Sequence, residues 1–215
     1  MAQAETVEKI LNAALVLFAE RGFAETSLRT ITGMADVNLA AVNYHFGSKK
    51  ELIQAVFSKF LQPFCEILEK ELDSLEAAQP EGGAPSAEQV ISCVLDTMLK
   101  TTTVCGVSVQ RLTRLLNLAY TQSQEHLRHH LVANFGKTYH RMTTLMHKTM
   151  PGVSPVEFYW RLYFMLGAAV FTLSSFDSLR SILNTDYSTD TELEEVLHLM
   201  VPALAGMLRS PHDPT

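Results

Sequence analysis

Apolar residues recur at helical spacing along almost the whole chain, beginning with a stripe close to the N-terminus. That stripe consists of Val7, Ile10, Leu11, Ala14, Leu17 and Phe18. Its period predicts an amphipathic helix, and Gly22 stands where such a helix ends in a left-handed conformation. A second, shorter stripe of Leu28, Ile31 and Met34 predicts another helix, which Thr26 and Ser27 are placed to cap.

The segment "NLAAVNYHFGSKKEL" predicts the end of one helix and the start of the next in immediate succession. Asn38 can cap a short helix over residues 39–45, and Gly47 ends that helix. Ser48 and Glu51 then form an S-x-x-E capping box. This box opens a long helix that runs to about residue 75.

Beyond the long helix, the Pro- and Gly-rich stretch "AQPEGGAPS" at 78–86 predicts a loop. The later helices are predicted at about 87–102, 108–120, 123–149, 155–177 and 191–209. Ser154 and Glu157 form a second capping box, with Pro155 at the first helical position. Because no strand alternation and no repeat is visible, the fold class is predicted to be all-α.

The net charge of −6 over 215 residues is unevenly distributed. Residues 1–50 contain five basic and five acidic side chains, so the remaining residues hold all of the excess negative charge. The field of the whole molecule repels nucleic acid and anionic membranes. Any affinity for DNA must therefore come from a local patch.

The composition also predicts a cytoplasmic protein that does not enter a membrane. The N-terminus "MAQAETVEK" lacks the apolar core of a signal peptide, and the most apolar stretch, 162–176, is too short to cross a bilayer. Three cysteines (Cys65, Cys93 and Cys105) form an odd count without metal-ligand spacing. This pattern favours reduced, buried thiols.

The two short helices around Asp36-Val37-Asn38 have the proportions of a helix-turn-helix motif. The second helix of such a motif enters the major groove, where the small side chains of Ala40 and Ala41 permit close approach. Asn43 can hydrogen-bond a base edge, with adenine as the favoured geometry. The alternative is a packing module without DNA, in which Tyr44, His45 and Phe46 belong to the core.

Phosphate contacts are predicted in the last turn of this second helix and in the first turn of the helix that follows it. Tyr44 and His45 offer an O–H and an N–H group to phosphates. Lys49 and Lys50 lie in the first turn of the next helix, where a cation opposes the helix dipole at a cost of a few tenths of a kcal/mol. A phosphate bound at that N-terminus offsets this cost.

Residues 6–57 resemble the N-terminal domain of TetR-family transcriptional regulators. The matching motifs are "ALVLF" at 14–18, Gly22-Phe23, "TSL" at 26–28, "YHFG" at 44–47 and "SKKEL" at 48–52. One departure is that Tyr44 and His45 are adjacent, whereas many members place a residue between them. The resemblance implies a DNA-binding domain over 1–52, with the helix-turn-helix at about 26–45, and a ligand-binding and dimerisation domain over 53–215. The predicted DNA-binding residues are Thr26, Ser27, Thr30, Asn38, Leu39, Ala40, Ala41, Asn43, Tyr44, His45, Lys49 and Lys50.

Within the family, "VNLAAVNYHFGSKKELIQAVF", "LNLAYTQSQEHLR" and "FYWRLYFMLGAAVF" are similar to the fatty-acid-sensing Psr-type regulators of pseudomonads. The resemblance implies a repressor that a ligand releases from a palindromic double-stranded DNA operator. It also implies a homodimer joined by the last two helices, at about 155–177 and 191–209. Gly167-Ala168-Ala169 permits close helix contact there. The predicted seam stripe is Leu193, Val196, Leu197, Met200, Val201, Leu204 and Met207.

The C-terminal part is rich in flexible and aromatic apolar residues, which suit a fatty acid or its thioester. Arg114 and Arg161 are the candidate cations for an acidic head group. The predicted ligand-binding residues are Phe60, Phe64, Met98, Arg114, Met142, Arg161, Phe164, Met165 and Phe171. Three alternatives remain open: a core without a ligand, a regulator that senses a non-lipid drug or metabolite, and a helical lipid-binding protein that does not bind DNA.

No catalytic motif is visible in the sequence, so no enzymatic activity is predicted. There is no G-x-S-x-G, no P-loop and no H-E-x-x-H segment. His126, His129 and His130 fall on one predicted helix, but no further ligand stands at a matching offset. We therefore predict neither a metal nor a cofactor.

Overall fold

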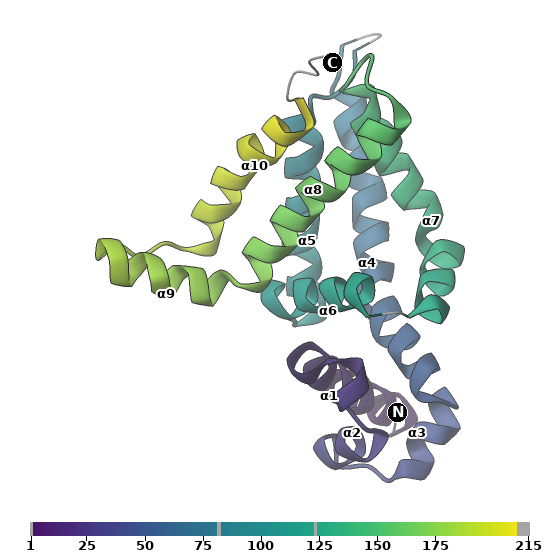
Figure 1. The fold of residues 1–215 in the computed structure, drawn as a ribbon. Coiled ribbons are helices and arrows are strands. Elements are labelled where there is room, and N and C mark those ends of the chain that lie inside the picture. The colour runs from purple at the N-terminus through teal and green to yellow at the C-terminus, as the bar shows by residue number, and fades with distance from the viewer. Residues whose placement is uncertain (1, 81–82, 123, 210–215) are drawn as a thin grey trace. The chain divides into compact units, whose positions relative to one another are not determined.

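In the computed structural model, residues 2–80, 83–122 and 124–209 are described, and every regular element in these ranges is an α-helix (Figure 1). The helices are α1 (Ala2–Glu25), α2 (Leu28–Ala35), α3 (Leu39–Phe46), α4 (Lys49–Ala77), α5 (Ala87–Cys105), α6 (Val109–Thr121), α7 (Glu125–Lys148), α8 (Pro155–Ser174), α9 (Phe176–Tyr187) and α10 (Leu193–Arg209). The all-α prediction is confirmed. Residues 81–82 of the predicted loop and residue 123 of a predicted helix lie outside the described residues.

The predicted caps delimit the N-terminal helices. The hydroxyl of Ser27 accepts the N–H of Thr30 at 3.0 Å, and Oδ1 of Asn38 accepts the N–H of Ala41 at 2.8 Å. Gly22 and Gly47 adopt positive φ angles of 81° and 74°. Glycine adopts these angles without the strain that a side chain would introduce.

The predicted apolar stripe of α2 is partly wrong. Met34 is 54% exposed, whereas Thr32 and Ala35 join Ile31 on the buried face. An eight-residue helix has about two turns, so three apolar residues fix its buried face poorly.

The predicted helix at 155–177 is wrong at its C-terminal end. Ser175 leaves the helical conformation with φ −107° and ψ 9°, and a separate helix, α9, follows. The hydroxyl of Ser174 donates to the Phe171 carbonyl at 3.2 Å. Serine side chains compete in this way with the backbone ladder. The apolar periodicity runs through this point, so it did not indicate the break.

No single helix within 2–80, 83–122 and 124–209 is long and apolar enough to cross a membrane. The pairs α5 with α6 and α8 with α9 meet that criterion only together, and they bend by 108° and 72° at their junctions.

The helices pack as two compact units. Unit 1 comprises residues 1–63 and 102–136, and unit 2 comprises residues 64–101 and 137–215. α4, α5 and α7 therefore contribute residues to both units. The predicted boundary at residue 52 differs from this division, because packing groups α6 and the first half of α7 with α1, α2 and α3.

A row of buried aromatic rings forms the centre of unit 1. The ring centroids of Phe18 and Phe23 on α1 lie 5.3 Å apart, and that of Phe23 lies 6.2 Å from the ring of Phe57 on α4. Phe57 in turn lies 5.2 Å from Phe60. Lys59 adds a polar tie from α4 to α1, because its Nζ donates to Oδ1 of Asn12 at 2.6 Å. These contacts hold α1 on α4 and so support α2 and α3, which pack on α1.

Pro63 interrupts the hydrogen-bond ladder of α4. Proline has no N–H group, so the carbonyl of Lys59, four residues earlier, lacks its helical donor. The thiol of Cys105 on α5 donates to this carbonyl at 3.7 Å. A weak donor from a neighbouring helix thus replaces the missing bond.

Unit 2 contains two main packing contacts. Leu68 and Leu72 on α4 pack with Leu145 on α7. α8 and α10 pack against each other, and the buried residues of α10 are Leu197, Met200, Leu204, Ala205 and Leu208.

Candidate nucleic-acid interface

The exposed face of α3 is formed by Leu39, Ala40, Asn43 and Tyr44. On the opposite face Val42 is fully buried. The exposed face is small at Ala40 and carries an amide and a phenol one turn later, with Tyr44 75% exposed. A helix inserts into the major groove with such a surface, because small side chains permit approach and the amide can read a base edge.

Three other predicted residues of this segment are less available. The Ala41 side chain is partly covered, and the Asn38 side chain is occupied at Oδ1 by the cap of α3. The ring of His45 is half-buried and lies edge-on to the Tyr44 ring, with centroids 4.9 Å apart. His45 therefore orients Tyr44 in addition to offering its own N–H.

The N-terminus of α2 presents two hydroxyl groups. Oγ of Ser27 lies 2.8 Å from Oγ1 of Thr30 and also caps the helix. Arg29 is exposed between them. We did not predict Arg29, although the argument applied to Lys49 and Lys50 also identifies it: a cation in a first helical turn is unfavourable unless an anion binds there.

The prediction that Thr26 contacts DNA is wrong for its side chain. It is completely buried, and its hydroxyl donates to the carbonyls of Leu17 at 3.2 Å and Gly22 at 2.8 Å. A side chain in this position cannot reach a phosphate. It ties the start of α2 to α1 instead.

The first turn of α4 carries the two predicted lysines. Nζ of Lys49 lies 3.5 Å from the Ala24 carbonyl, a long contact, and Lys50 is exposed. Ser48 accepts the N–H of Glu51 at 3.3 Å, which confirms the Ser48 half of the capping box. Cations and free N–H groups therefore share this helix end.

Gly22 and Gln122 fix the end of α1 within unit 1. Oε1 of Gln122 accepts the N–H of Phe23 at 3.3 Å. A Cβ atom at Gly22 would lie 3.0 Å from Nε2 of the same Gln122 side chain. The break in α1 at Gly22 thus requires a positive φ angle, and a side chain there would press on that of Gln122.

Two family models match the chain. "Bacterial regulatory proteins, tetR family" covers residues 10–56, and "Tetracyclin repressor-like, C-terminal domain" covers residues 92–207. The chain belongs to the TetR family.

Curated relatives of this TetR-family chain match it over part of its length. The "Probable HTH-type transcriptional regulator YttP" of Bacillus subtilis is 32% identical over 91 residues, which are 42% of this chain and 41% of that protein. The HTH-type transcriptional repressor Rv3405c of Mycobacterium tuberculosis is 37% identical over 89 residues, which are 40% and 47%. The chain therefore spans less than half the length of these relatives. They are named as transcriptional regulators, and the TetR family consists of regulators rather than enzymes.

Solved structures share the fold of this TetR-family chain over nearly its whole length. The fatty acid degradation regulator FadR from Bacillus halodurans superimposes with a TM-score of 0.61 at 14% identity, covering 95% of this chain and 96% of that one. FadR from Bacillus subtilis, solved in complex with stearoyl-CoA, gives a TM-score of 0.56 at 14% identity and covers 95% and 98%.

The predicted ligand-binding residues of the TetR-family chain do not form one set. Phe60 and Arg114 belong to unit 1, where Phe60 is part of the aromatic row and Arg114 is exposed. The other seven belong to unit 2. Within it, Phe64 and Met142 pack against the cluster of Leu68, Leu72 and Leu145. Met98 and Met165 are buried.

Three of the predicted ligand-binding residues in unit 2 are placed differently from the prediction. Phe164 and Phe171 are 59% and 62% exposed, so in the single chain they line no enclosed chamber. The guanidinium of Arg161 donates to the Leu208 carbonyl at 2.5 Å and to the Glu157 carboxylate at 2.6 Å. It therefore joins α8 to the end of α10 and already has a counterion.

Thr97 on α5 is a polar group that we did not predict. It is completely buried, and its hydroxyl has no hydrogen-bond partner of normal geometry among the described residues. The thiol of Cys93 lies near it, but a thiol is a weak partner. An unsatisfied buried hydroxyl costs about 1–3 kcal/mol. Its next neighbour in sequence, Met98, is one of the predicted ligand residues.

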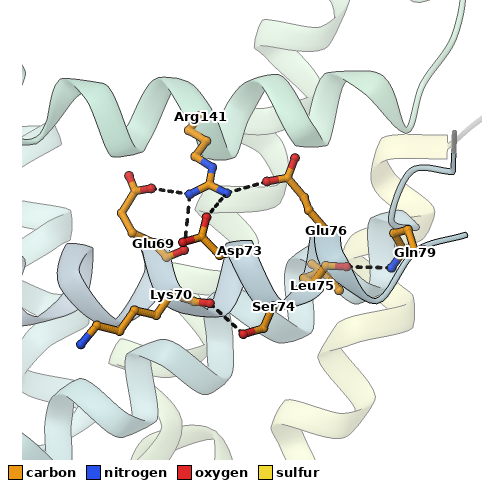
Figure 2. Close-up of polar contacts among 8 residues, drawn as sticks. All are labelled: Glu69, Lys70, Asp73, Ser74, Leu75, Glu76, Gln79 and Arg141. Atoms are coloured by element: carbon orange, nitrogen blue, oxygen red, sulfur yellow. Dashed lines mark hydrogen bonds and ion pairs between the residues drawn. The ribbon is translucent and has the colours of Figure 1, made fainter. Parts of the chain in front are cut away.

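Arg141 joins α7 to several acidic residues of unit 2. Figure 2 shows its guanidinium reaching three carboxylates on α4: Glu69 at 2.5 Å, Asp73 at 2.7 Å and Glu76 at 2.5 Å. These carboxylates raise the pKa of Arg141. The pKa of Glu69 is lowered by the Thr138 hydroxyl and by Arg141. The arrangement fastens α7 to the second half of α4.

Part of the predicted seam stripe on the last helix is not exposed. Leu197, Met200 and Leu204 are buried within the chain, where α10 packs on α8. Met207 of the predicted stripe and Leu199 remain exposed on α10. A longer exposed apolar run lies on α8, at Val156, Trp160, Phe164, Gly167 and Phe171. We call these five residues the α8 stripe. They recur at intervals of three and four residues, so they occupy one side of the helix.

Proposed function

We propose that the chain is a homodimeric transcriptional repressor that an apolar effector releases from a pseudo-palindromic DNA operator. The observation that carries this proposal is the exposed α3 face. It is small at Ala40 and carries Asn43 and Tyr44, and cationic helix N-termini lie before and after it in sequence. Membership of the TetR family supports the same reading.

In this proposal α3 enters the major groove and the neighbouring helix ends bind phosphates. Asn43 hydrogen-bonds a base edge. Tyr44 hydrogen-bonds a phosphate of the DNA backbone, and Lys50 neutralises a phosphate. Arg29 with Ser27 binds a further phosphate at the start of α2. These local cations thus provide the affinity for DNA, even though the net negative charge of the whole chain repels it.

Operator titrations test the assignment of roles. After bound genomic fragments are selected, affinity is measured against salt concentration. Lys50→Ala should flatten the slope of log K against log salt by about 0.9, because one phosphate contact is lost. Asn43→Ala should leave the slope unchanged and relax preference at one operator position. Lys148→Ala, which removes an exposed lysine of α7, is the matched control. Selection that enriches no sequence would favour the alternative of a lipid-binding protein.

The proposed dimer forms through α8 and α10. The α8 stripe is apolar and unburied, and outside the backbone of its own helix no atom lies within 4 Å of the position that a Gly167 Cβ would occupy. Gly206 on α10 has the same open surroundings. Two helices can therefore approach a second copy closely. A two-fold dimer places its recognition helices at half-sites about 34–36 Å apart or further.

Trp160, the only tryptophan of the chain, provides the test of the dimer. Its side chain is exposed in the single chain and becomes buried if the α8 stripe forms the seam. The fluorescence emission should shift to longer wavelength on dilution, together with halving of the mass in sedimentation. Phe164→Glu should make the protein monomeric, because it places an unpaired charge in an apolar contact. A mass that stays dimeric would place the seam elsewhere.

The proposed effector is a long apolar molecule with a polar head, such as a fatty acid or its thioester. Three observations support it: the methionine and phenylalanine content of unit 2, the unsatisfied Thr97 hydroxyl, and the fold shared with FadR from Bacillus subtilis, which was solved in complex with stearoyl-CoA. The narrower similarity to Psr-type regulators remains a prediction. Each buried methylene contributes about 0.8 kcal/mol. The concentration of acyl chain needed to release the DNA should therefore fall as the chain lengthens. A concentration that does not depend on chain length would favour a non-lipid effector.

A further inference from the structure

The first turn of α3 exposes apolar side chains, whereas the next turn exposes polar ones. Leu39 is 37% exposed, and the side chain of Ala40 is exposed beside it. Asn43 and Tyr44, one turn later, carry an amide and a phenol. Val42 is fully buried and anchors the helix from its other side. The exposed parts of Leu39 and Ala40 therefore take no part in the packing of unit 1.

Helix geometry fixes where this apolar turn lies relative to Asn43. Leu39 and Ala40 each precede a residue of the polar turn by four positions, so the two turns share one side of the helix. A rise of 1.5 Å per residue places them about 6 Å apart along the axis. The Asn38 cap, whose Oδ1 accepts the N–H of Ala41 at 2.8 Å, keeps this first turn helical. Because stacked base pairs are about 3.4 Å apart, the apolar turn faces a position within about two base pairs of the one that Asn43 contacts.

An apolar turn in the major groove has one complementary group on the bases, the C5-methyl group of thymine. The other groups on the base edges there are hydrogen-bond donors and acceptors. Leu39 and Ala40 have no side-chain atom that can bond such a group, so they would remove it from water without compensation, which is unfavourable. Removing a methyl group from water is favourable. The chemistry of the first turn therefore selects thymine.

We propose that Leu39 and Ala40 recognise a thymine of the operator through its methyl group. This inference rests on the proposed function, because it requires α3 to enter the major groove. It predicts that each half-site holds a thymine within about two base pairs of the base that Asn43 contacts. A cytosine at that position lacks the methyl group and turns an N4 donor toward an apolar surface. Replacing the T·A pair by C·G should therefore weaken binding more than tenfold.

Uracil in place of thymine tests the methyl contact alone, because the two bases differ only by that methyl group. Asn43→Ala first identifies the operator position that it relaxes. Each thymine within two base pairs of this position is then replaced singly by uracil, and the dissociation constant of the wild-type protein is measured. At one of these positions uracil should weaken binding about fourfold, the contribution of one buried methyl group. Equal affinity for thymine and uracil at every such position would overturn the proposal.

Variants of α3 test whether these two residues make the contact. In the double variant Leu39→Ala/Ala40→Gly, the ratio of the uracil to the thymine dissociation constant should fall from about four to about one. Ala133→Gly makes the same backbone change at an exposed position of α7 and should keep the wild-type ratio. Each ratio compares two duplexes with one protein, so a variant of lower stability still gives a valid result. A fourfold ratio in the double variant would overturn the proposal.

The outcomes separate this inference from the proposed function. If selection of genomic fragments enriches no sequence, both fail. If an operator is enriched but no thymine near the Asn43 position contributes through its methyl group, the inference fails and α3 remains the proposed recognition helix.

Discussion

The hydroxyl of Ser58 on α4 lies 2.7 Å from Nε2 of His130 on α7. One turn earlier on each helix, Nε2 of Gln54 donates to the backbone carbonyl of His126 at 3.0 Å. The His130 side chain and the His126 backbone carbonyl therefore join α7 to α4 inside unit 1. His129, between them in sequence, is exposed and lies 4.0 Å from Glu125. The H-x-x-H-H motif is thus a helix contact within unit 1, and no cluster able to hold a metal occurs among the described residues.

His126 should make the stability of unit 1 sensitive to acid. Burial, and then the charge of Lys50, lower the pKa of this histidine below 6.5, so the folded chain holds it neutral. A depressed histidine pKa stabilises the folded state above 6.5, and this contribution is lost as the pH falls below that value. NMR titration should find His126 protonating below pH 6.5. His126→Gln should weaken the acid dependence of urea unfolding between pH 6.5 and 5. A His126 pKa at or above 6.5 would contradict this assignment.

Gly22→Ala and Gly33→Ala should change stability in opposite directions. At Gly22 the φ angle is 81° and a Cβ would meet the Gln122 side chain at 3.0 Å, so alanine should destabilise the chain by about 1–2 kcal/mol. Gly33 lies inside α2 with no heavy atom within 4 Å of its Cβ position. Alanine there should stabilise the chain by about 0.5–1 kcal/mol. Denaturant unfolding of both variants measures the difference, and two changes of equal sign would be inconsistent with the turn geometry.

Arg141→Met should loosen unit 2 by leaving three carboxylates of α4 close together. The partly exposed pairs are screened by solvent, so we expect a loss of about 1–2 kcal/mol. Added salt should recover part of this loss, because the remaining groups repel each other. Because the pKa of Glu69 is lowered, its ionised carboxylate stabilises the folded state above pH 4.5, and this contribution is lost as the pH falls below that value. In Arg141→Met the free energy of unfolding should therefore fall less steeply with acid. Arg128→Met, at an exposed position, is the control, and an equal effect of both variants would rule out a stabilising role for the Arg141 ion pairs.

Thr97→Val should separate stability from effector binding. Valine has nearly the same shape and removes a hydroxyl that is buried without a good partner, so the free protein should be equally stable or more stable by about 1 kcal/mol. If the hydroxyl bonds the effector, binding should weaken by about tenfold. Thermal unfolding with and without the effector measures both quantities. A marked loss of stability in the free protein would show that Thr97 already has a structural partner.

The predictable parts of the molecule are those that short-range chemistry determines. Ser27, Asn38 and Ser154 cap their helices because each bond involves a backbone group three residues away. Gly22 and Gly47 were predictable for the same reason, because the positive φ angle that each adopts is a property of its own backbone. This local information predicted both the helix-turn-helix and the surface that α3 exposes.

The features that the sequence did not predict depend on distant partners. Met34 is exposed because Thr32 and Ala35 occupy the buried face of α2 instead, and Thr26 is buried because α1 supplies two carbonyls. Phe164 and Leu197 are both apolar at helical spacing, yet one is exposed and the other is buried. Periodicity identifies an apolar side of a helix but not which neighbour covers it.

The interruption at Pro63 makes α4 mechanically uneven. Bending a helix normally strains a series of hydrogen bonds, but at Lys59 the bond that would resist bending is absent, and the Cys105 thiol that replaces it is a weak and deformable donor. The bending stiffness of α4 is therefore lowest over the single turn from Lys59 to Pro63. We therefore expect any bend of α4 to be concentrated at this turn.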